Sequence, residues 1–243
     1  MGGCERSVLR DNGAAAFMRK VALMRWIGST VVALALGTSA VLVTGPAKAQ
    51  QAPERSSGWS TATNVMTLSA IGMQLIMPRV FYSDPEVVVG WKARWHVSVF
   101  APVMTVTTLA LFNEQLLKNE IGGHRPGCDT NSQGGPGCSS YGMLSTQSFA
   151  ASAAFGQGLG TFLVDTLKWS DGQFNFGAFA GNTAVPGVLA IITTAGRGAG
   201  NWETAGQAWG SAGIGLLTGV GIGALYASAQ RPECGYSGSL ICW

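Results

Sequence analysis

The chain has 243 residues, of which 35 are Gly, 15 are basic and 12 are acidic. Glycine is therefore about 14% of the chain, roughly twice its usual share, and the charged fraction of 11% is less than half the usual value. A chain this apolar is not expected to be disordered. It also has too few basic residues for a nucleic-acid-binding protein. The glycines follow no three-residue period, which excludes collagen. The length allows one domain or two, and the composition indicates a membrane or membrane-adjacent protein.

The first fifty residues have the order of a secretory signal peptide. Basic residues precede a charge-free apolar run over residues 27–43, and Ala-Lys-Ala at 47–49 predicts cleavage after Ala49. The alternative is an uncleaved anchor helix, because the apolar run is close to the length that spans a bilayer. We therefore predict an exported protein, either in the inner membrane with a site that faces the periplasm or, if soluble, in the periplasm.

Removal of the leader changes both the charge and the cysteine count. The leader holds six basic and two acidic residues, so the mature chain has 9 basic and 10 acidic residues, a net charge of −1. Four cysteines remain, and an even number in an exported chain predicts two disulfides. Three connectivities are open, of which local pairing of Cys128 with Cys138 and of Cys234 with Cys242 is the simplest. Metal binding is the rival, but no C-x-x-C or paired histidines accompany these cysteines, so we predict no metal site.

Charge-free stretches dominate the rest of the chain. They cover residues 56–78, 97–113, 130–164, 172–196 and 204–230. Several are long enough to cross a bilayer, and their Ala, Gly, Ser and Thr content suits closely packed helices. No long stretch alternates like a strand, so we predict an all-α bundle with about five membrane-embedded helices. The predicted organisation is a signal peptide over 1–49, a helix and connector over 50–90, the bundle over 91–230 and a disulfide-tied tail over 231–243.

The last apolar stretch repeats a small residue every four positions. These residues are Ser211, Gly215, Gly219, Gly223 and Ala227. On a helix this spacing builds a ridge without large side chains, against which another backbone can lie. We interpret the ridge as a helix-packing surface, and Gly215, Gly219 and Gly223 also offer a contact for a homo-oligomer.

Tryptophans lie at or near the ends of the apolar stretches, where indole rings settle at a bilayer interface. They are Trp91, Trp95, Trp169, Trp202 and Trp209. The same pattern also fits partly buried residues of a soluble bundle, and we favour the membrane. Residues 130–145 are too rich in Gly, Ser and Asn for a helix throughout, so we predict a loop there and a helix that resumes near Ser145.

Three of the nine basic residues of the mature chain lie at predicted helix ends: Lys118, Arg125 and Arg197. A lysine ammonium and the planar forks of two arginines suit phosphate oxygens. A helix that starts at Ser145 adds free backbone N–H groups and a hydroxyl. These residues predict an oxyanion site, and the alternative is snorkelling at an interface or pairing with nearby carboxylates.

The order and spacing of these elements resemble the type 2 phosphatidic acid phosphatase superfamily. Its motifs are Lys-x6-Arg-Pro, Pro-Ser-Gly-His and Ser-Arg-x5-His-x3-Asp, and it includes lipid phosphatases with six membrane helices, soluble acid phosphatases and vanadium haloperoxidases. The first motif matches as Lys118, Arg125 and Pro126, and the resemblance covers about residues 91–225. It implies a helical bundle that binds a phosphorylated lipid or similar phosphate ester through Lys118, Arg125, Ser145 and Arg197, with no cofactor.

Both catalytic histidines of that family are missing here. Gln147 stands at the position of the acid, and a count without gaps puts Glu203 at the nucleophile and Gln207 at its orienting Asp. One histidine of the family attacks phosphorus and the other protonates the leaving oxygen, so we expect the family's route to be absent. Glu203 is a conceivable substitute nucleophile, although a phosphate repels a carboxylate unless cations compensate. The motif positions give His96 and His124 no natural role.

Three hypotheses remain. The first is a phosphatase-superfamily membrane protein that binds a phosphorylated lipid and has lost most or all hydrolysis. The second is a divergent active phosphomonoesterase that acts on lipid phosphates through Glu203, His124 or water. The third is a Gly-rich membrane scaffold or interaction protein.

Overall fold

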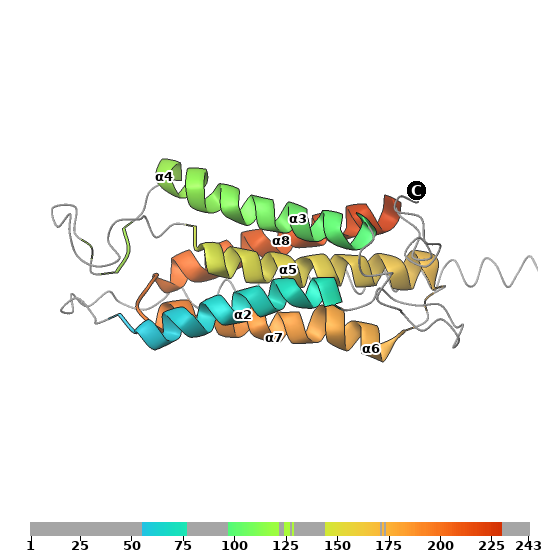
Figure 1. Ribbon diagram of the computed structural model, residues 1–243, viewed down its shortest axis with the longest axis horizontal. Coiled ribbons are helices and arrows are strands. Elements are labelled where there is room, and N and C mark those ends of the chain that lie inside the picture. The colour runs from blue at the N-terminus through green and yellow to red at the C-terminus, as the bar shows by residue number, and fades with distance from the viewer. Residues whose placement is uncertain are drawn as a thin grey trace, which may run out of the picture. The chain divides into compact units, whose positions relative to one another are not determined.

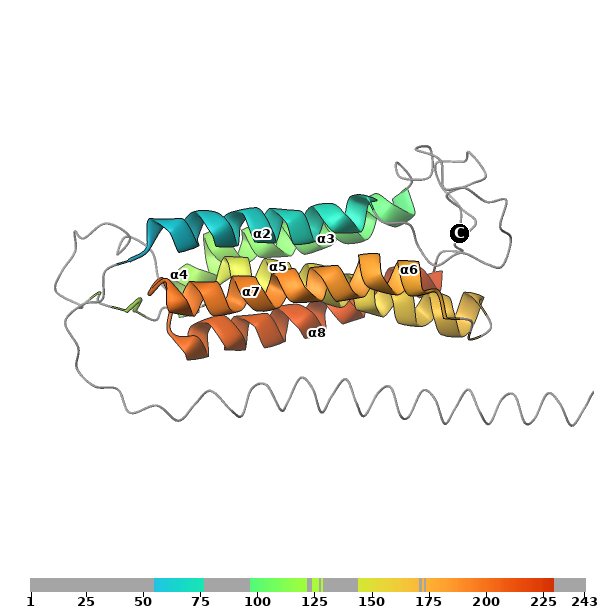
Figure 2. The ribbon, with the colours of Figure 1, turned by 90° about the horizontal axis from the view of Figure 1, so that it is seen from below.

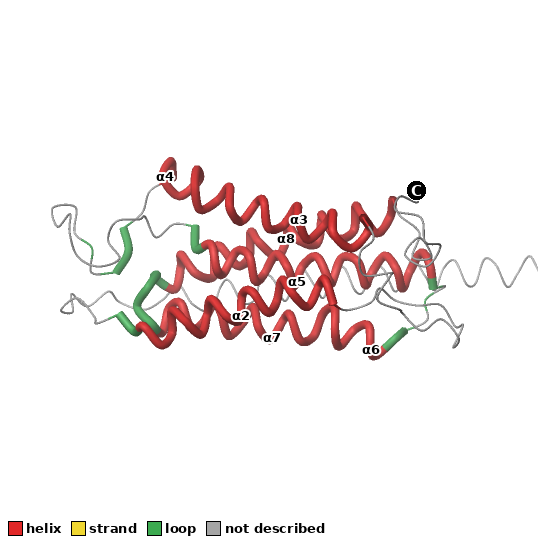
Figure 3. Tube along the Cα trace, in the orientation of Figure 1, coloured by secondary structure: helices red, strands yellow, loops and turns green. Residues whose placement is uncertain are grey.

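A computed structural model describes residues 55–76, 97–121, 124–126, 128, 144–170, 172 and 174–229. All of them belong to the second of the two units into which the chain divides, Leu42–Trp243. The predicted leader, the cysteines Cys138, Cys234 and Cys242, and the tail over 231–243 lie outside the described residues. The described residues form helices and no strand, which confirms the all-α prediction (Figure 3).

The described chain forms long helical segments that lie side by side (Figure 1). Several pass through a π-helical turn without a break. The segments are α2 (Ser57–Ile76); α3 (Val97–Phe112), which continues through Asn113–Leu117 into α4 (Lys118–Ile121); α5 (Thr146–Val164), which continues through Asp165–Trp169; α6 (Phe176–Phe179), which continues through Ala180–Ala184 into α7 (Val185–Ala199); and α8 (Ala205–Ala229).

Helix α5 lies at the centre of the bundle (Figures 1 and 2). It packs against α2, α3, α7 and α8, and those four helices also contact one another in the cyclic order α2, α7, α8, α3. Helices α2, α5 and α8 run in one direction, while α3 and α7 run in the opposite direction (Figure 1). The starts of α2, α5 and α8 therefore share one end of the bundle with the ends of α4 and α7.

The most extensive helix contact is between α5 and α8, and small residues make it possible. All five members of the predicted ridge, from Ser211 to Ala227, are buried. A Cβ added to Gly219 would lie 2.8 Å from the backbone nitrogen of Gln157, and a Cβ on Gly156 would lie 2.9 Å from that of Val220. The ridge is thus confirmed as a helix-packing surface within one chain. A homo-oligomer formed through the same ridge would require α5 and α8 to separate.

The described bundle has a small-residue interior and a large-residue exterior. Its buried apolar side chains are mostly alanines, with Val103, Val106, Phe149 and Phe162 as the larger members. Large apolar side chains are instead exposed on each of the four outer helices: Val65, Leu68 and Ile76; Met104 and Leu111; Val185, Val188 and Ile191; and Ile214, Leu217 and Leu225. Two helical segments, Phe176–Ala199 and Ala205–Ala229, are long and apolar enough to cross a membrane.

Candidate functional site

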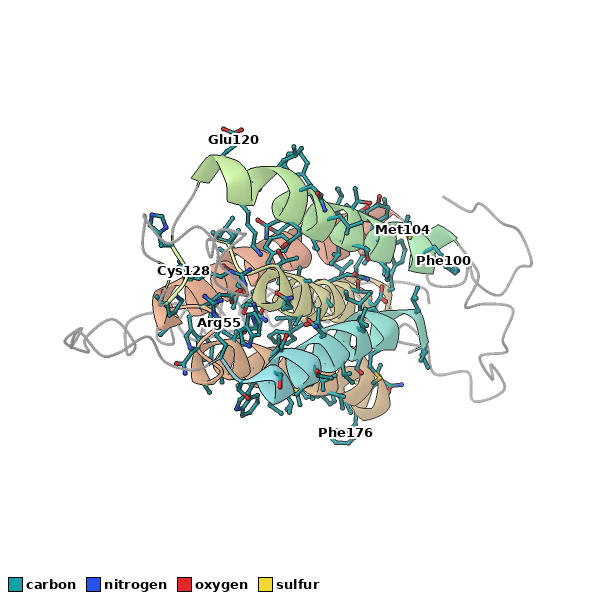
Figure 4. All side chains as sticks on the ribbon, turned by 60° about the vertical axis from the view of Figure 1, so that its left-hand side comes forward. Arg55, Phe100, Met104, Glu120, Cys128 and Phe176 are labelled. Carbon is teal, nitrogen blue, oxygen red and sulfur yellow. The ribbon has the colours of Figure 1, made fainter. Side chains whose placement is uncertain are left out.

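The predicted site residues come together at the end of the bundle where α2, α5 and α8 begin (Figure 1). Ser145 is the N-cap of α5, Lys118 begins α4 and Arg197 lies in the last turn of α7. Glu203 lies in the connection that leads to α8. Arg55 lies two residues before the start of α2 and joins this group, with Cys128 nearby (Figure 4). We call this group the cation cluster; its members are Arg55, Lys118, Arg125, Cys128, Ser145, Arg197, Trp202 and Glu203.

The turn between α7 and α8 forms a buried ion pair. Asn201 adopts the left-handed conformation with φ 58°, and the N–H of Trp202 donates to the carbonyl of Arg197 at 3.1 Å. This reversal brings Nη2 of Arg197 to 2.8 Å from Oε1 of Glu203, and the two side chains are only 3% and 0% exposed. Two further atoms of the pair, Arg197 Nε and Glu203 Oε2, are buried without a hydrogen-bond partner.

Trp202 is the centre of the cation cluster. The guanidinium carbons of Arg197, Arg55 and Arg125 lie 5.4, 5.6 and 6.0 Å from the centroid of its ring. At these distances the negative face of an indole attracts a guanidinium. The indole Nε1–H donates to the carbonyl of Ser56 at 2.9 Å, which fixes the ring against the start of α2. Three guanidinium groups therefore lie around one indole ring.

Arg55 was not among the predicted site residues. Its Nη2 donates to the carbonyl of Pro126 at 3.2 Å and to Sγ of Cys128 at 2.7 Å, which ties the segment after α4 to the start of α2. Cys128 is in a disulfide-bonded state, and the connectivity stays a prediction because the other predicted disulfide cysteines lie outside the described residues. The only sequence signal for Arg55 is its position directly before a charge-free stretch.

Arg125 is buried in the cluster, with 8% of its surface exposed. Burial lowers the pKa of its guanidinium, and the positive charges of Arg197 and Arg55 lower it further, while the charges of Glu203 and Glu114 raise it. The guanidinium keeps its proton, since an arginine is not deprotonated in proteins. The lowered pKa therefore reports mainly that this guanidinium is buried, and the charges of Arg197 and Arg55 show that two further cations are close to it.

Lys118 has a carboxylate partner one helical turn earlier. Its Nζ lies 2.7 Å from Oε2 of Glu114, and the hydroxyl of Thr146 donates to the same oxygen. Burial raises the pKa of Glu114, but the bonds from Lys118 and Thr146 and the positive charges of Lys118 and Arg125 outweigh it and hold the pKa below its ordinary value. The contact joins the end of α3 to the start of α5.

The hydroxyl of Ser145 caps α5. Its oxygen accepts from the N–H of Ser148 at 3.3 Å and donates to the Ser148 hydroxyl at 3.0 Å, and the residue is fully buried. The N–H of Ser145 donates to Oγ of Ser211 on α8 at 2.7 Å. The helix start predicted near Ser145 is therefore confirmed, and the hydroxyl is engaged in capping.

The two glutamines at the family's catalytic positions lie at the same end. Gln147 donates from Nε2 to Oδ1 of Asn64 on α2 at 3.2 Å, and its Oε1 is buried without a partner. Gln207 accepts the N–H of Thr204 at 2.9 Å and donates to the carbonyl of His124 at 3.1 Å. His124 itself is exposed, and His96 lies outside the described residues.

The cation cluster is rich in positive charge. It gathers one lysine and three arginines against the carboxylates of Glu114 and Glu203. The described part of the chain contains no group of three His, Cys, Asp or Glu side chains that could hold a metal ion. No family model, curated protein or solved structure matches the chain.

Proposed function

We propose that this chain is a phosphatase-superfamily membrane protein that binds a phosphorylated lipid or similar phosphate ester at the cation cluster, with hydrolysis lost or much reduced. One observation carries the proposal: three guanidinium groups lie within 6.0 Å of the Trp202 ring, at the same end of the bundle as the buried Lys118. Arginine forks recognise phosphate oxygens by paired, charge-assisted hydrogen bonds.

The charge balance favours an anion. Four basic side chains face two carboxylates, so the described part of the cluster has a formal excess of two positive charges. Glu114 is already bonded to Lys118, and Glu203 to Arg197. Burial of like charges is costly in free energy, and a bound phosphate would offset that cost.

A lipid is the favoured ligand because the bundle suits a bilayer. The helical segments Phe176–Ala199 and Ala205–Ala229 are long and apolar enough to cross a bilayer. Large apolar side chains on the four outer helices face away from the bundle interior. In water they would form an exposed apolar surface of a kind that soluble proteins avoid, whereas acyl chains would cover them. A site at the end of such helices lies at the depth of lipid head groups.

Loss of hydrolysis follows from the side chains at the two catalytic positions. Gln147 cannot transfer a proton at neutral pH, because an amide has no titratable proton there. The carboxylate of Glu203 is buried and bonded to Arg197 through Oε1, and this ion pair lowers the nucleophilicity of the carboxylate as a whole. The exported location and the periplasmic face of the site are proposed from the leader and the disulfide cysteines.

The test is a titration of the purified chain in detergent with short-chain phosphatidic acid, alongside an assay of phosphate release. Arg125→Gln is expected to weaken binding by about tenfold or more, since one charge-assisted contact is lost. Lys168→Gln is the matched control, because Lys168 is an exposed cation beside Trp169 at the other end of the bundle. We expect Lys168→Gln to bind phosphatidic acid as tightly as the unmodified chain does. We expect no phosphate release from any of the three proteins.

Two outcomes would contradict the proposal. Equal weakening by both substitutions would mean that the lipid responds to overall charge and not to the cation cluster. Phosphate release that Arg197→Ala abolishes would mean an active enzyme with an unfamiliar nucleophile.

A further inference from the structure

Glu203 has one oxygen that the fold leaves without a partner. Its Oε1 accepts from Arg197 at 2.8 Å, whereas its Oε2 is buried with no hydrogen-bond donor. The neighbouring Arg197 Nε is a buried donor that also lacks a partner. Buried polar atoms are nearly always paired, so this ion pair offers one free acceptor and one free donor to a bound group.

A group that satisfies both atoms has a defined chemistry. A carboxylate oxygen only accepts hydrogen bonds, so Oε2 requires a donor, while Arg197 Nε requires an acceptor. A phosphate oxygen that bears a proton supplies the donor, and an unprotonated oxygen of the same phosphate supplies the acceptor. A bare oxyanion would place two charged, proton-free oxygens against each other in a buried site, where their repulsion is weakly screened.

We propose that Glu203 selects the ligand by its proton: the cation cluster takes phosphate groups that carry a P–O–H, such as inorganic phosphate and singly protonated phosphate monoesters, and rejects sulfate and phosphodiesters. This inference rests on the proposed function and names its specificity-determining residue. The arginines supply attraction to any anion. Glu203 supplies the discrimination, because only a protonated oxyanion satisfies Oε2.

The first experiment uses the unmodified chain in detergent at pH 6, where about half of a phosphate monoester carries the proton. One arm compares inorganic phosphate with sulfate, and the other compares dihexanoyl phosphatidic acid with its methyl diester. We expect phosphate and phosphatidic acid to bind about tenfold to hundredfold more tightly than their partners, the factor of one hydrogen bond to a charged group. Sulfate is at least as negative as phosphate, so charge alone predicts no such preference. Comparison of the two arms shows whether the acyl chains add affinity.

The second experiment repeats the titrations with Glu203→Gln. A glutamine keeps the size of the side chain and can donate to a bare oxyanion, so both ratios are expected to fall to about one. Glu120→Gln is the matched control, because Glu120 is an exposed carboxylate at the same end of the bundle. It removes one negative charge and should leave both ratios unchanged.

The outcomes separate this inference from the proposed function. If the unmodified chain binds both anions of each pair equally, Glu203 selects nothing, while phosphate binding at the cluster stands. If preferences persist in Glu203→Gln, another group is responsible. If no anion binds, the proposed function fails and the inference with it. Should the Glu203 variant not fold, the ratios of the unmodified chain alone still decide whether protonated oxyanions are preferred.

Discussion

Gly219 marks a point where α8 lies directly against the backbone of α5, and one added carbon there is expected to destabilise the bundle. A Cβ at this position would lie 2.8 Å from both the carbonyl carbon of Ala153 and the nitrogen of Gln157, and closer still to the Ala153 carbonyl oxygen. These atoms belong to the backbone of a helix and cannot rotate away. To reach ordinary contact at 3.4 Å, α8 would have to retreat from α5 by more than about 0.6 Å.

The magnitude follows from two opposing effects of Gly219→Ala. Alanine favours a helix over glycine by about 1 kcal/mol. Overpacking of a close interface costs about 1–3 kcal/mol. If α8 retreats by more than about 0.6 Å, each contact that opens between the helices loses a quarter or more of its dispersion energy. Because α5 and α8 share the most extensive helix contact in the described bundle, we expect the second effect to prevail.

The matched control is Gly221→Ala on the same helix. Gly221 is exposed, and a Cβ there would meet no atom within 4 Å, so only the helix preference acts. We expect Gly221→Ala to gain up to about 1 kcal/mol. Because Gly219→Ala gains the same helix preference, the two variants are expected to differ by the overpacking cost, about 1–3 kcal/mol. Unfolding in detergent, followed by circular dichroism at 222 nm, measures both. Equal stabilities for the two variants would refute the close approach of α8 to α5.

Two further predictions concern the charged end of the bundle. Arg197→Leu is expected to cost about 3–5 kcal/mol of unfolding free energy, because it leaves Glu203 buried without a cation, and Arg197→Leu combined with Glu203→Leu should recover most of the loss. A single variant as stable as the parent would contradict this. The pKa of Glu114 is held below its ordinary value of 4.5. The ionised carboxylate therefore contributes its full stabilisation above pH 4.5, and this stabilisation is lost as the pH falls through the lowered pKa. Unfolding measured from pH 6 to pH 3 should show this loss, and Lys118→Met should reduce it.

Local patterns in the sequence predicted the helices well. Charge-free stretches became helical segments, and the loop that ends near Ser145 precedes a helix capped by that residue. The four-residue period from Ser211 to Ala227 became a buried ridge. Each of these features depends on residues that are close in sequence, and the spacing alone determines which side chains share a helix face.

The partners of the charged residues were harder to predict. Lys118 pairs with Glu114, a spacing of four on one helix that the sequence does display. Arg197 pairs with Glu203 across a reversal that depends on the left-handed φ of Asn201, which no local pattern indicates. Arg55 reaches Trp202 only because α2 packs beside α7. Such contacts arise from tertiary packing.

The packing ridge and the cation cluster meet at one residue, Ser211. It is the first member of the ridge, and its hydroxyl accepts the N–H of Ser145 and donates to the carbonyl of Gln207. Thr146, at the start of α5, bonds to Glu114, and Glu203 lies in the turn before α8. The register of α8 on α5 therefore sets the distance between these two carboxylates. The glycines that allow two backbones to touch thus also bring the two halves of the cluster together. A larger residue on the ridge would separate the halves as well as the helices, so stability and anion binding depend on the same interface.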